Sequence, residues 1–170
     1  LLNNDTEMID GGAIGEMLGY CMRGDVGIVG AKLLYEDETI QHAGVVLGFG
    51  GTAGHAFIGK PRYDTGYFGR ILCAQDEVGG LTEELAVAFN DIDFCLKVRK
   101  TGKLVVYDPY AEWFHYESKS RGYEDSPEKV ERFNDEVDTL LRSWREIIEQ
   151  GDPYYNPNLT LDNSDFSLRK

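Results

Sequence analysis

The sequence predicts an α/β protein, with a mixed sheet flanked by helices and a long amphipathic helix near the C-terminus. Three observations predict this class. Apolar, β-branched runs alternate along the chain with segments of helical period. Residues 130–148 place apolar side chains at spacings of three and four. The length of 170 residues and the hydrophobic share of 42% suit one globular domain with a buried core.

The first half of the chain predicts mainly strands, with one short helix. β-branched residues mark the strands, and a possible N-cap followed by helical spacing marks the helix. The expected elements are a strand end and turn at 1–5, a helix from Asp10 to Met22, strands over 26–35 and 39–48, and an ordered loop over 52–69.

The second half predicts two helices around a broken strand. Ser126 followed by Pro127 is a strong helix start, because proline suits the first helical position. The expected elements are a short strand over 70–74, a helix over 91–101 capped by Asn90, strand segments over 103–107 and 111–115, and a helix from Pro127 to Gly151. We expect residues 1–150 to form the domain and residues 151–170 to form an extended tail.

Charge and cysteine content exclude several classes of protein. The formal net charge of −13 argues against binding to nucleic acid or to an anionic membrane, because phosphate contacts need clustered Lys and Arg. The cysteines are Cys21, Cys73 and Cys95, and none forms a C-x-x-C pair. This odd, scattered set predicts reduced core thiols instead of a disulfide framework. No apolar run has the length of a transmembrane helix.

Asp5 is a candidate metal ligand. It lies in a turn directly after the apolar pair Leu1 and Leu2, and ligands gather at the carboxyl ends of strands in α/β sheets. Mg²⁺ often takes one or two protein carboxylates together with substrate phosphates. The same residues also suit an ordinary turn, in which Asn and Asp side chains bond their own backbone. Spacing alone leaves both interpretations open.

Asp91 and Asp93 are candidate catalytic residues at the start of a predicted helix. A carboxylate there acts as a general base if it lies within hydrogen-bond reach of a hydroxyl. Acidic residues are also common in first helical turns for electrostatic reasons alone. A structural role and a catalytic role therefore both remain open.

His115 ends a predicted strand and is followed by two hydroxyls and two cations. Histidine binds transition metals such as Mn²⁺. Lys119 and Arg121, beside Ser118 and Ser120, form a composition that suits a diphosphate. A packed histidine and a solvated loop would have the same sequence, so both interpretations stand.

Taken in order, these motifs resemble family 2 glycosyltransferases of the GT-A type, in their rhamnosyltransferase-like bacterial branch. LLNNDTE at 1–7 resembles the metal-binding turn of that family, and VGGLTEE at 78–84 resembles its Val-Gly-Gly segment. NDIDFCLK at 90–97 resembles the start of its acidic helix, and the run from 103 to His115 resembles the strand that leads to its late histidine. The resemblance covers residues 1 to about 150.

The resemblance implies a partial, Rossmann-like GT-A fold and an inverting sugar transfer from a nucleotide-diphosphate sugar to an acceptor hydroxyl. Asp5 and His115 would bind a divalent metal, Mn²⁺ or Mg²⁺. Asp91 would be the general base, and Asp93 would orient the acceptor or the backbone. Lys119 and Arg121 would contact phosphate oxygens. The implied setting is bacterial polysaccharide synthesis, with a glycan or lipid-linked acceptor, in the cytoplasm or at the inner face of the membrane.

Two departures from the family pattern carry expectations of their own. The family's N-terminal half has no counterpart in this sequence, and a core element is missing between Gln75 and Val78. We therefore expect this stretch to correspond to the metal and acceptor side and to be inactive by itself. The alternative is a non-catalytic fragment that forms a homo-oligomer or exchanges strands between copies, since open sheet edges favour pairing.

Overall fold

The main sheet of the protein is mixed, with four strands in the residues that the structure describes. The computed structural model describes residues 4–65, 82, 84–85, 88–116, 126–163 and 166–169. The strands, in the order in which they lie side by side, are β1 (Thr6–Met8), β6 (Leu104–His115), β2 (Val26–Leu34) and β3 (Ile40–His42). The central pair, β2 and β6, is parallel, and both outer strands are antiparallel to their neighbours.

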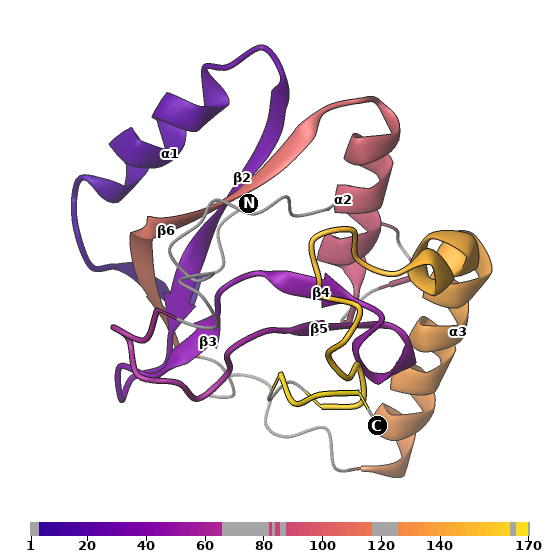
Figure 1. The fold of residues 1–170 in the computed structure, drawn as a ribbon. Coiled ribbons are helices and arrows are strands. Elements are labelled where there is room, and N and C mark those ends of the chain that lie inside the picture. Colours follow the sequence, from indigo (N-terminus) through magenta and orange to yellow (C-terminus); the bar gives the residue numbers. More distant parts are fainter. Residues whose placement is uncertain are drawn as a thin grey trace.

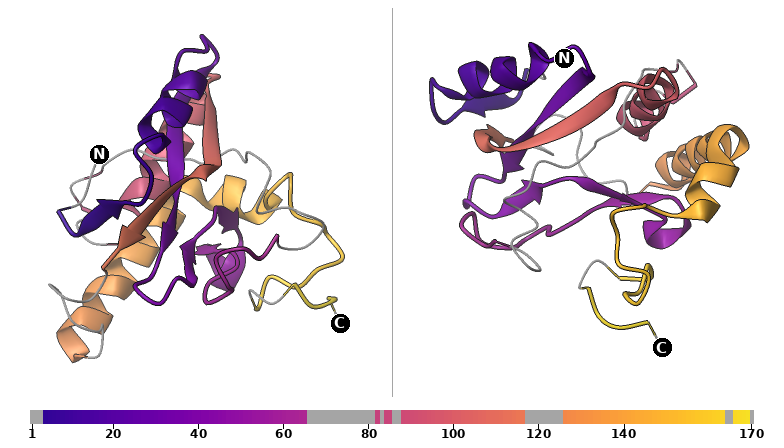
Figure 2. Two further views of the ribbon diagram at one scale, coloured as in Figure 1. Left: turned by 90° about the vertical axis from the view of Figure 1, so that its left-hand side faces the viewer. Right: turned by 45° about the horizontal axis from the view of Figure 1, so that its top comes forward.

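Three helices flank this sheet in the described residues (Figure 1). They are α1 (Ala13–Cys21), α2 (Asn90–Lys100) and α3 (Pro127–Gln150). Helix α1 packs on one side of the β2–β6 pair, and α2 and α3 lie on the other side, as both views of Figure 2 show. The α/β prediction is confirmed, together with the expected positions of the three helices.

The helix ends differ in detail from their predicted caps. Ser126 caps α3 as expected, with its hydroxyl accepting a hydrogen bond from the Lys129 amide. Helix α2 is entered through Phe89 in a left-handed conformation (φ 59°), so Asn90 is its first residue and not its cap. Helix α1 begins after Gly12, whose amide donates to the Asp10 carboxylate. In α1 and α2, therefore, the N-cap position is occupied by a residue near the polar one that the sequence favours as the cap.

The predicted strand over 39–48 is two strands in two sheets. The strand is interrupted at Gly44, whose φ of 96° is a conformation that favours glycine. Beyond it, β4 (Val45–Leu47) pairs antiparallel with β5 (Ala53–His55) in a separate small sheet. The loop expected over 52–69 therefore contains a strand. The strand expected over 70–74 lies outside the described residues.

The strand break predicted at Asp108–Pro109 does not occur, because one strand, β6, runs through both residues. Register along the β2–β6 ladder jumps from Ala31 opposite Asp108 to Lys32 opposite Glu112. Pro109 falls in this irregularity, where its missing N–H removes no regular ladder bond. Strand β6 therefore continues to His115 and reaches the far end of the sheet.

The core lies between the main sheet, the small sheet and helices α2 and α3. One buried cluster joins β2, β3 and β4 to Tyr107 of β6, and another joins α2 to Leu140, Trp144 and Ile148 of α3. The segment after α3 has no helix in its described residues, but it is more than a surface tail. Its Tyr155 and Leu159 are buried in the first of these clusters.

The cysteines divide between surface and core. Cys95 is buried in α2, as expected for a core thiol, whereas Cys21 at the end of α1 is exposed. The prediction of a core thiol is therefore wrong for Cys21. Cys73 lies outside the described residues.

Candidate functional site

Asp5 and His115 lie side by side at the end of the main sheet. Strand β1 pairs with β6 so that Thr6 is opposite His115, and the Tyr116 amide donates to the Asp5 carbonyl at 2.9 Å. This register brings His115 Nε2 to 3.4 Å from Asp5 Oδ1. The two predicted metal ligands are therefore neighbours in space, although they belong to the first and the last of the sequence motifs.

Within the described residues, Gln41 is a further polar neighbour of the pair, and one Asp5 oxygen has no hydrogen-bond partner. His115 Nδ1 lies 2.6 Å from Oε1 of Gln41, a buried residue of β3. Asp5 Oδ1 is itself inaccessible and accepts no hydrogen bond in the described part of the chain. Buried carboxylate oxygens are normally satisfied, so this oxygen beside an imidazole is available to a water molecule or a cation.

The geometry of the pair fits a divalent cation. With metal–ligand bonds of about 2.1 Å, two ligands at right angles or slightly wider lie roughly 3.0–3.4 Å apart. Carboxylate oxygen and imidazole nitrogen together suit Mn²⁺ and related ions. Within the described residues no cluster of three or more His, Cys, Asp or Glu side chains exists. Phosphate oxygens and water would complete the coordination, as they do at many Mg²⁺ sites.

Asp91 is exposed in the first turn of α2. Its Oδ1 accepts a hydrogen bond from the Ile92 amide at 2.9 Å, and its side chain remains open to solvent. Helix α2 and β6 run in opposite directions because only residues 101–103 separate them. The first turn of α2 therefore lies toward the end of the sheet at which β6 ends (Figure 1).

Asp93 has a very different environment from Asp91. It is buried, with an exposed fraction of 3%. Trp144 Nε1–H of α3 donates to its Oδ1 at 2.7 Å, while Thr82 and Lys97 both donate to its Oδ2. Burial acts to raise the pKa of Asp93, but the hydrogen bonds from Lys97, Thr82 and Trp144 outweigh it and hold the pKa below its ordinary value. An ionised carboxylate with this many donors ties α2 to α3.

The predicted phosphate contacts cannot be placed beside these residues. Lys119 and Arg121 lie outside the described residues, as do the Val-Gly-Gly segment and the Gln75–Val78 junction. Their roles stay predictions from the resemblance.

Sequence reasoning missed two polar groups near the site. Gln41 lies inside a predicted strand and carries no motif. The available signal was its position next to apolar Ile40, which places the two side chains on opposite faces of the strand. The second is a charge cluster across the sheet. Glu112 of β6 accepts from Lys32 at 3.0 Å and from Arg62 at 2.8 Å. Lys32 is almost fully buried, and this cluster fixes the loop at Arg62 to the β2–β6 pair.

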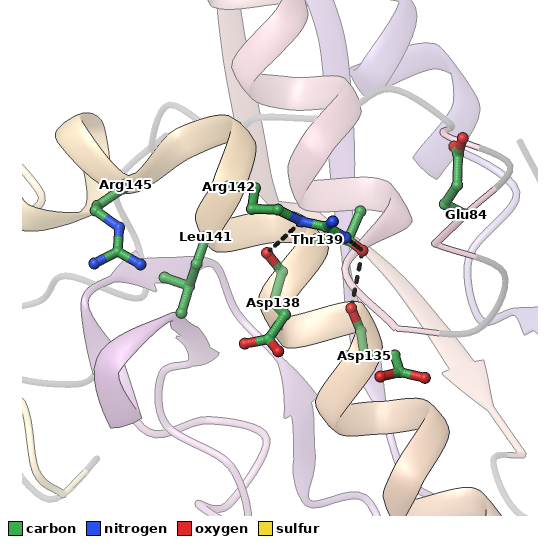
Figure 3. A pocket seen from close by; sticks show the side chains of 7 residues that line it. All are labelled: Glu84, Asp135, Asp138, Thr139, Leu141, Arg142 and Arg145. Atoms are coloured by element: carbon green, nitrogen blue, oxygen red, sulfur yellow. Dashed lines mark hydrogen bonds between the residues drawn. The ribbon is translucent and has the colours of Figure 1, made fainter.

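A separate surface depression runs along α3. It has a volume of about 620 Å³ and is lined by Glu84, Asp135, Asp138, Thr139, Leu141, Arg142 and Arg145. Figure 3 shows Arg142 and Thr139 engaged in hydrogen bonds to the helix itself rather than pointing at a common centre. None of the predicted site residues that the structure describes lines it.

No helix in the described part of the chain combines the length and the apolar character needed to cross a bilayer. No protein-family model matches the chain, and no solved structure matches it. Two curated proteins match almost its whole length. It is 48% identical to an uncharacterised protein of Sinorhizobium fredii, y4gI, over 186 residues that cover 99% of the chain and 20% of that protein.

It is also 34% identical to the O-antigen biosynthesis protein RfbC of Myxococcus xanthus, over 187 residues that cover 99% of the chain and 14% of that protein. Both matched stretches are longer than the 170-residue chain, so each relative carries additional residues within the shared part. The chain spans about a fifth and a seventh of the lengths of these two relatives, and one of them carries a name from bacterial polysaccharide synthesis.

Proposed function

We propose that this chain is the metal and acceptor side of a family 2, GT-A type glycosyltransferase in bacterial polysaccharide synthesis. The proposed reaction is an inverting transfer of a sugar from a nucleotide-diphosphate sugar to an acceptor hydroxyl. The observation that carries the proposal is the approach of Asp5 to His115, two residues selected from motifs at opposite ends of the domain. The name of the Myxococcus xanthus relative supports the polysaccharide setting.

The metal-binding part of the site consists of Asp5 and His115. The Asp5 carboxylate and His115 Nε2 would hold a divalent cation at the end of β6. Such a cation, when bound, supplies positive charge against the diphosphate of the donor. A chain with a net charge of −13 needs that compensation if it is to bind a diphosphate.

The proton-accepting part consists of Asp91, with Asp93 supporting it. The Asp91 carboxylate is exposed and can receive a proton from an acceptor hydroxyl that approaches the first turn of α2. Asp93 faces the interior and bonds Trp144, so we assign it to positioning this turn and not to contact with the acceptor. Lys119 and Arg121 would contact the diphosphate, as the resemblance implies.

We further propose that this chain lacks a core element of the family; both relatives carry additional residues somewhere within the matched part. The family pattern expects that element between Gln75 and Val78. A site that lacks it would bind the donor diphosphate through the metal but would hold the acceptor poorly.

The proposal is tested by titrating the 170-residue chain with MnCl₂ in the presence and absence of UDP, GDP or dTDP. We expect one of these nucleotides to raise the Mn²⁺ affinity at least tenfold, because phosphate oxygens complete the coordination. Asp5→Asn should abolish this coupling, whereas Asp138→Asn on the exposed face of α3 should leave it unchanged and so control for unspecific binding to an acidic protein. Equal coupling in the Asp5→Asn variant would exclude this site.

A second candidate is a non-catalytic module that associates with a copy of itself. One observation favours it: Ile14, Leu18 and Met22 form an apolar row on α1 and are 56%, 56% and 80% exposed. Exposed apolar rows of this kind mark contact surfaces. This candidate predicts a dimer by light scattering that Leu18→Glu converts to a monomer; a monomeric wild-type chain excludes it.

A further inference from the structure

We infer that Gln41 is a positioning residue that holds His115 in the tautomer whose Nε2 lone pair faces Asp5. The inference rests on the proposed function, since its consequence is for binding of a cation by Asp5 and His115. It assigns a role to a residue of β3, a strand separate from β6, which carries His115, and from the turn that carries Asp5.

The position of Gln41 is fixed by its strand. The preceding residue, Ile40, receives a hydrogen bond at its carbonyl from the Gly59 amide at 2.8 Å. It also donates its own amide to the Lys60 carbonyl at 2.7 Å. Gln41 is only 6% exposed, and its Oε1 meets His115 Nδ1 at 2.6 Å across 74 positions of sequence. A buried amide on a tethered strand has little freedom to turn away from the imidazole.

The contact with Gln41 decides which nitrogen of His115 carries the proton. With the amide oxygen toward the ring, Nδ1 donates and Nε2 keeps its lone pair. In the opposite arrangement the amide NH₂ would face Nδ1, and Nε2–H would donate to Asp5. In the structure the amide oxygen of Gln41, and not its NH₂, lies toward Nδ1, which is the first arrangement. Nε2 then lies 3.4 Å from Asp5 Oδ1 without carrying a proton.

In this tautomer, two electron-rich atoms, His115 Nε2 and Asp5 Oδ1, lie close together in a partly buried position. The Nε2 lone pair and the Asp5 oxygen repel in that arrangement, and a cation between them removes the repulsion. Metal-bound histidines commonly donate their other N–H to a carbonyl or carboxylate, which fixes the ring and raises its basicity. Gln41 supplies that acceptor here. Loss of such a partner typically weakens metal affinity about 10- to 100-fold.

The first experiment reads the tautomer directly, without metal. Two-bond ¹H–¹⁵N correlation spectra of the chain, recorded above the ordinary His pKa of about 6.5, distinguish an Nδ1–H from an Nε2–H imidazole. His115→Gln identifies the His115 signals. The pair His42 and His55 serves as an internal reference, because their Nδ1 atoms lie 2.8 Å apart and one must donate to the other.

We expect His115 to be protonated at Nδ1 in the wild-type chain. Gln41→Met, which removes the acceptor at similar length, should shift His115 toward the Nε2–H form. Gln41→Glu retains an acceptor oxygen and should preserve the wild-type pattern, while Gln150→Met, the same replacement at an exposed position of α3, should change nothing. An Nε2–H pattern in the wild-type chain, or an unchanged pattern in a folded Gln41→Met variant, overturns the inference.

The second experiment measures MnCl₂ affinity of the same four chains. Gln41→Met should bind about 10- to 100-fold more weakly than wild type, with Gln41→Glu and Gln150→Met close to wild type. Equal affinity in a folded Gln41→Met chain overturns the inference even if Asp5→Asn abolishes binding. Absence of Mn²⁺ binding in the wild-type chain overturns the proposed function instead, and the nitrogen spectra still decide the role of Gln41.

Discussion

At the scale of single residues, two acidic side chains two positions apart have opposite surroundings. Asp91 is exposed and accepts one backbone hydrogen bond, whereas Asp93 is buried among three donors. The helical rotation of about 200° between residues two apart explains the difference, because it turns one carboxylate to solvent and the other to α3. The open side chain suits proton transfer, and the buried one suits attachment of the helix.

We expect Asp93→Asn to destabilise the protein by about 2–3 kcal/mol at neutral pH. The amide leaves buried donors poorly satisfied, but Lys97 is half exposed and regains water, which reduces the loss. Asp91→Asn is the matched control and should cost less than about 1 kcal/mol. Urea unfolding of both variants measures the difference, and similar losses in the two would contradict the role assigned to Asp93.

The same carboxylate predicts a pH dependence of stability. Because the pKa of Asp93 is lowered in the folded protein, its stabilisation is fully present above the unfolded-state pKa of about 3.9. It is lost as the pH falls through the lower folded-state pKa. Urea unfolding at a series of acidic pH values should therefore show a weaker acid dependence in Asp93→Asn than in the wild-type chain. Parallel curves for the two chains would count against this assignment.

The site could be predicted from sequence only in part, for a physical reason. The order of motifs selected Asp5 and His115, which the sheet register then brought together. Their partner Gln41 could not be predicted, because its contact depends on the place of β3 at the edge of the main sheet. The charge and polarity of single residues identify candidate site residues. Whether these residues meet in one site depends on how strands distant in the sequence pair.

At the scale of elements, the close packing of β2 against α2 depends on a glycine. A Cβ on Gly27 would lie 2.7 Å from Val98 Cγ1 and 3.1 Å from Lys103 Cβ. The first contact is shorter than real Cβ atoms make and the second is tight, so a side chain at residue 27 would push the strand and the helix apart. Helix α2 carries Asp91, so this packing also sets the position of the candidate base.

Gly27→Ala should therefore lower stability by about 1–3 kcal/mol through overpacking. Gly15→Ala provides a control of opposite sign. Nothing lies within 4 Å of a Cβ at position 15 in α1, so that change should stabilise the helix by about 0.5–1 kcal/mol. Thermal unfolding compares the two variants. A Gly27→Ala protein as stable as wild type would show that the helix and strand are more loosely packed than described.

Elements with a long, uniform pattern were predictable, and elements defined by a break were not. The stripe on α3 and the apolar run of β2 each favour one structure over their full length. Residues 39–48 read as one strand, because the left-handed turn at Gly44 changes the sheet without changing the apolar pattern. Likewise Pro109 indicated a break in β6, but the ladder accommodates it in an irregularity.

At the scale of the whole molecule, the acidic chain presents its candidate site at one end of a mixed sheet. Three features meet there: the end of β6 with His115, the turn with Asp5, and β3 with Gln41. The two relatives are several times longer than this chain. At this end of the sheet, Asp5 and His115 are proposed to hold one metal ion between them.

Pulsed electron paramagnetic resonance of the Mn²⁺-loaded chain tests this claim most directly, because it detects nitrogen bound to the metal. We expect coupling to one imidazole ¹⁴N in the wild-type chain, lost in His115→Gln and retained in His42→Gln. Asp5→Asn should remove the bound Mn²⁺ signal at the same metal concentration. A wild-type spectrum without ¹⁴N coupling, or coupling that survives in His115→Gln, would show that His115 does not bind the metal.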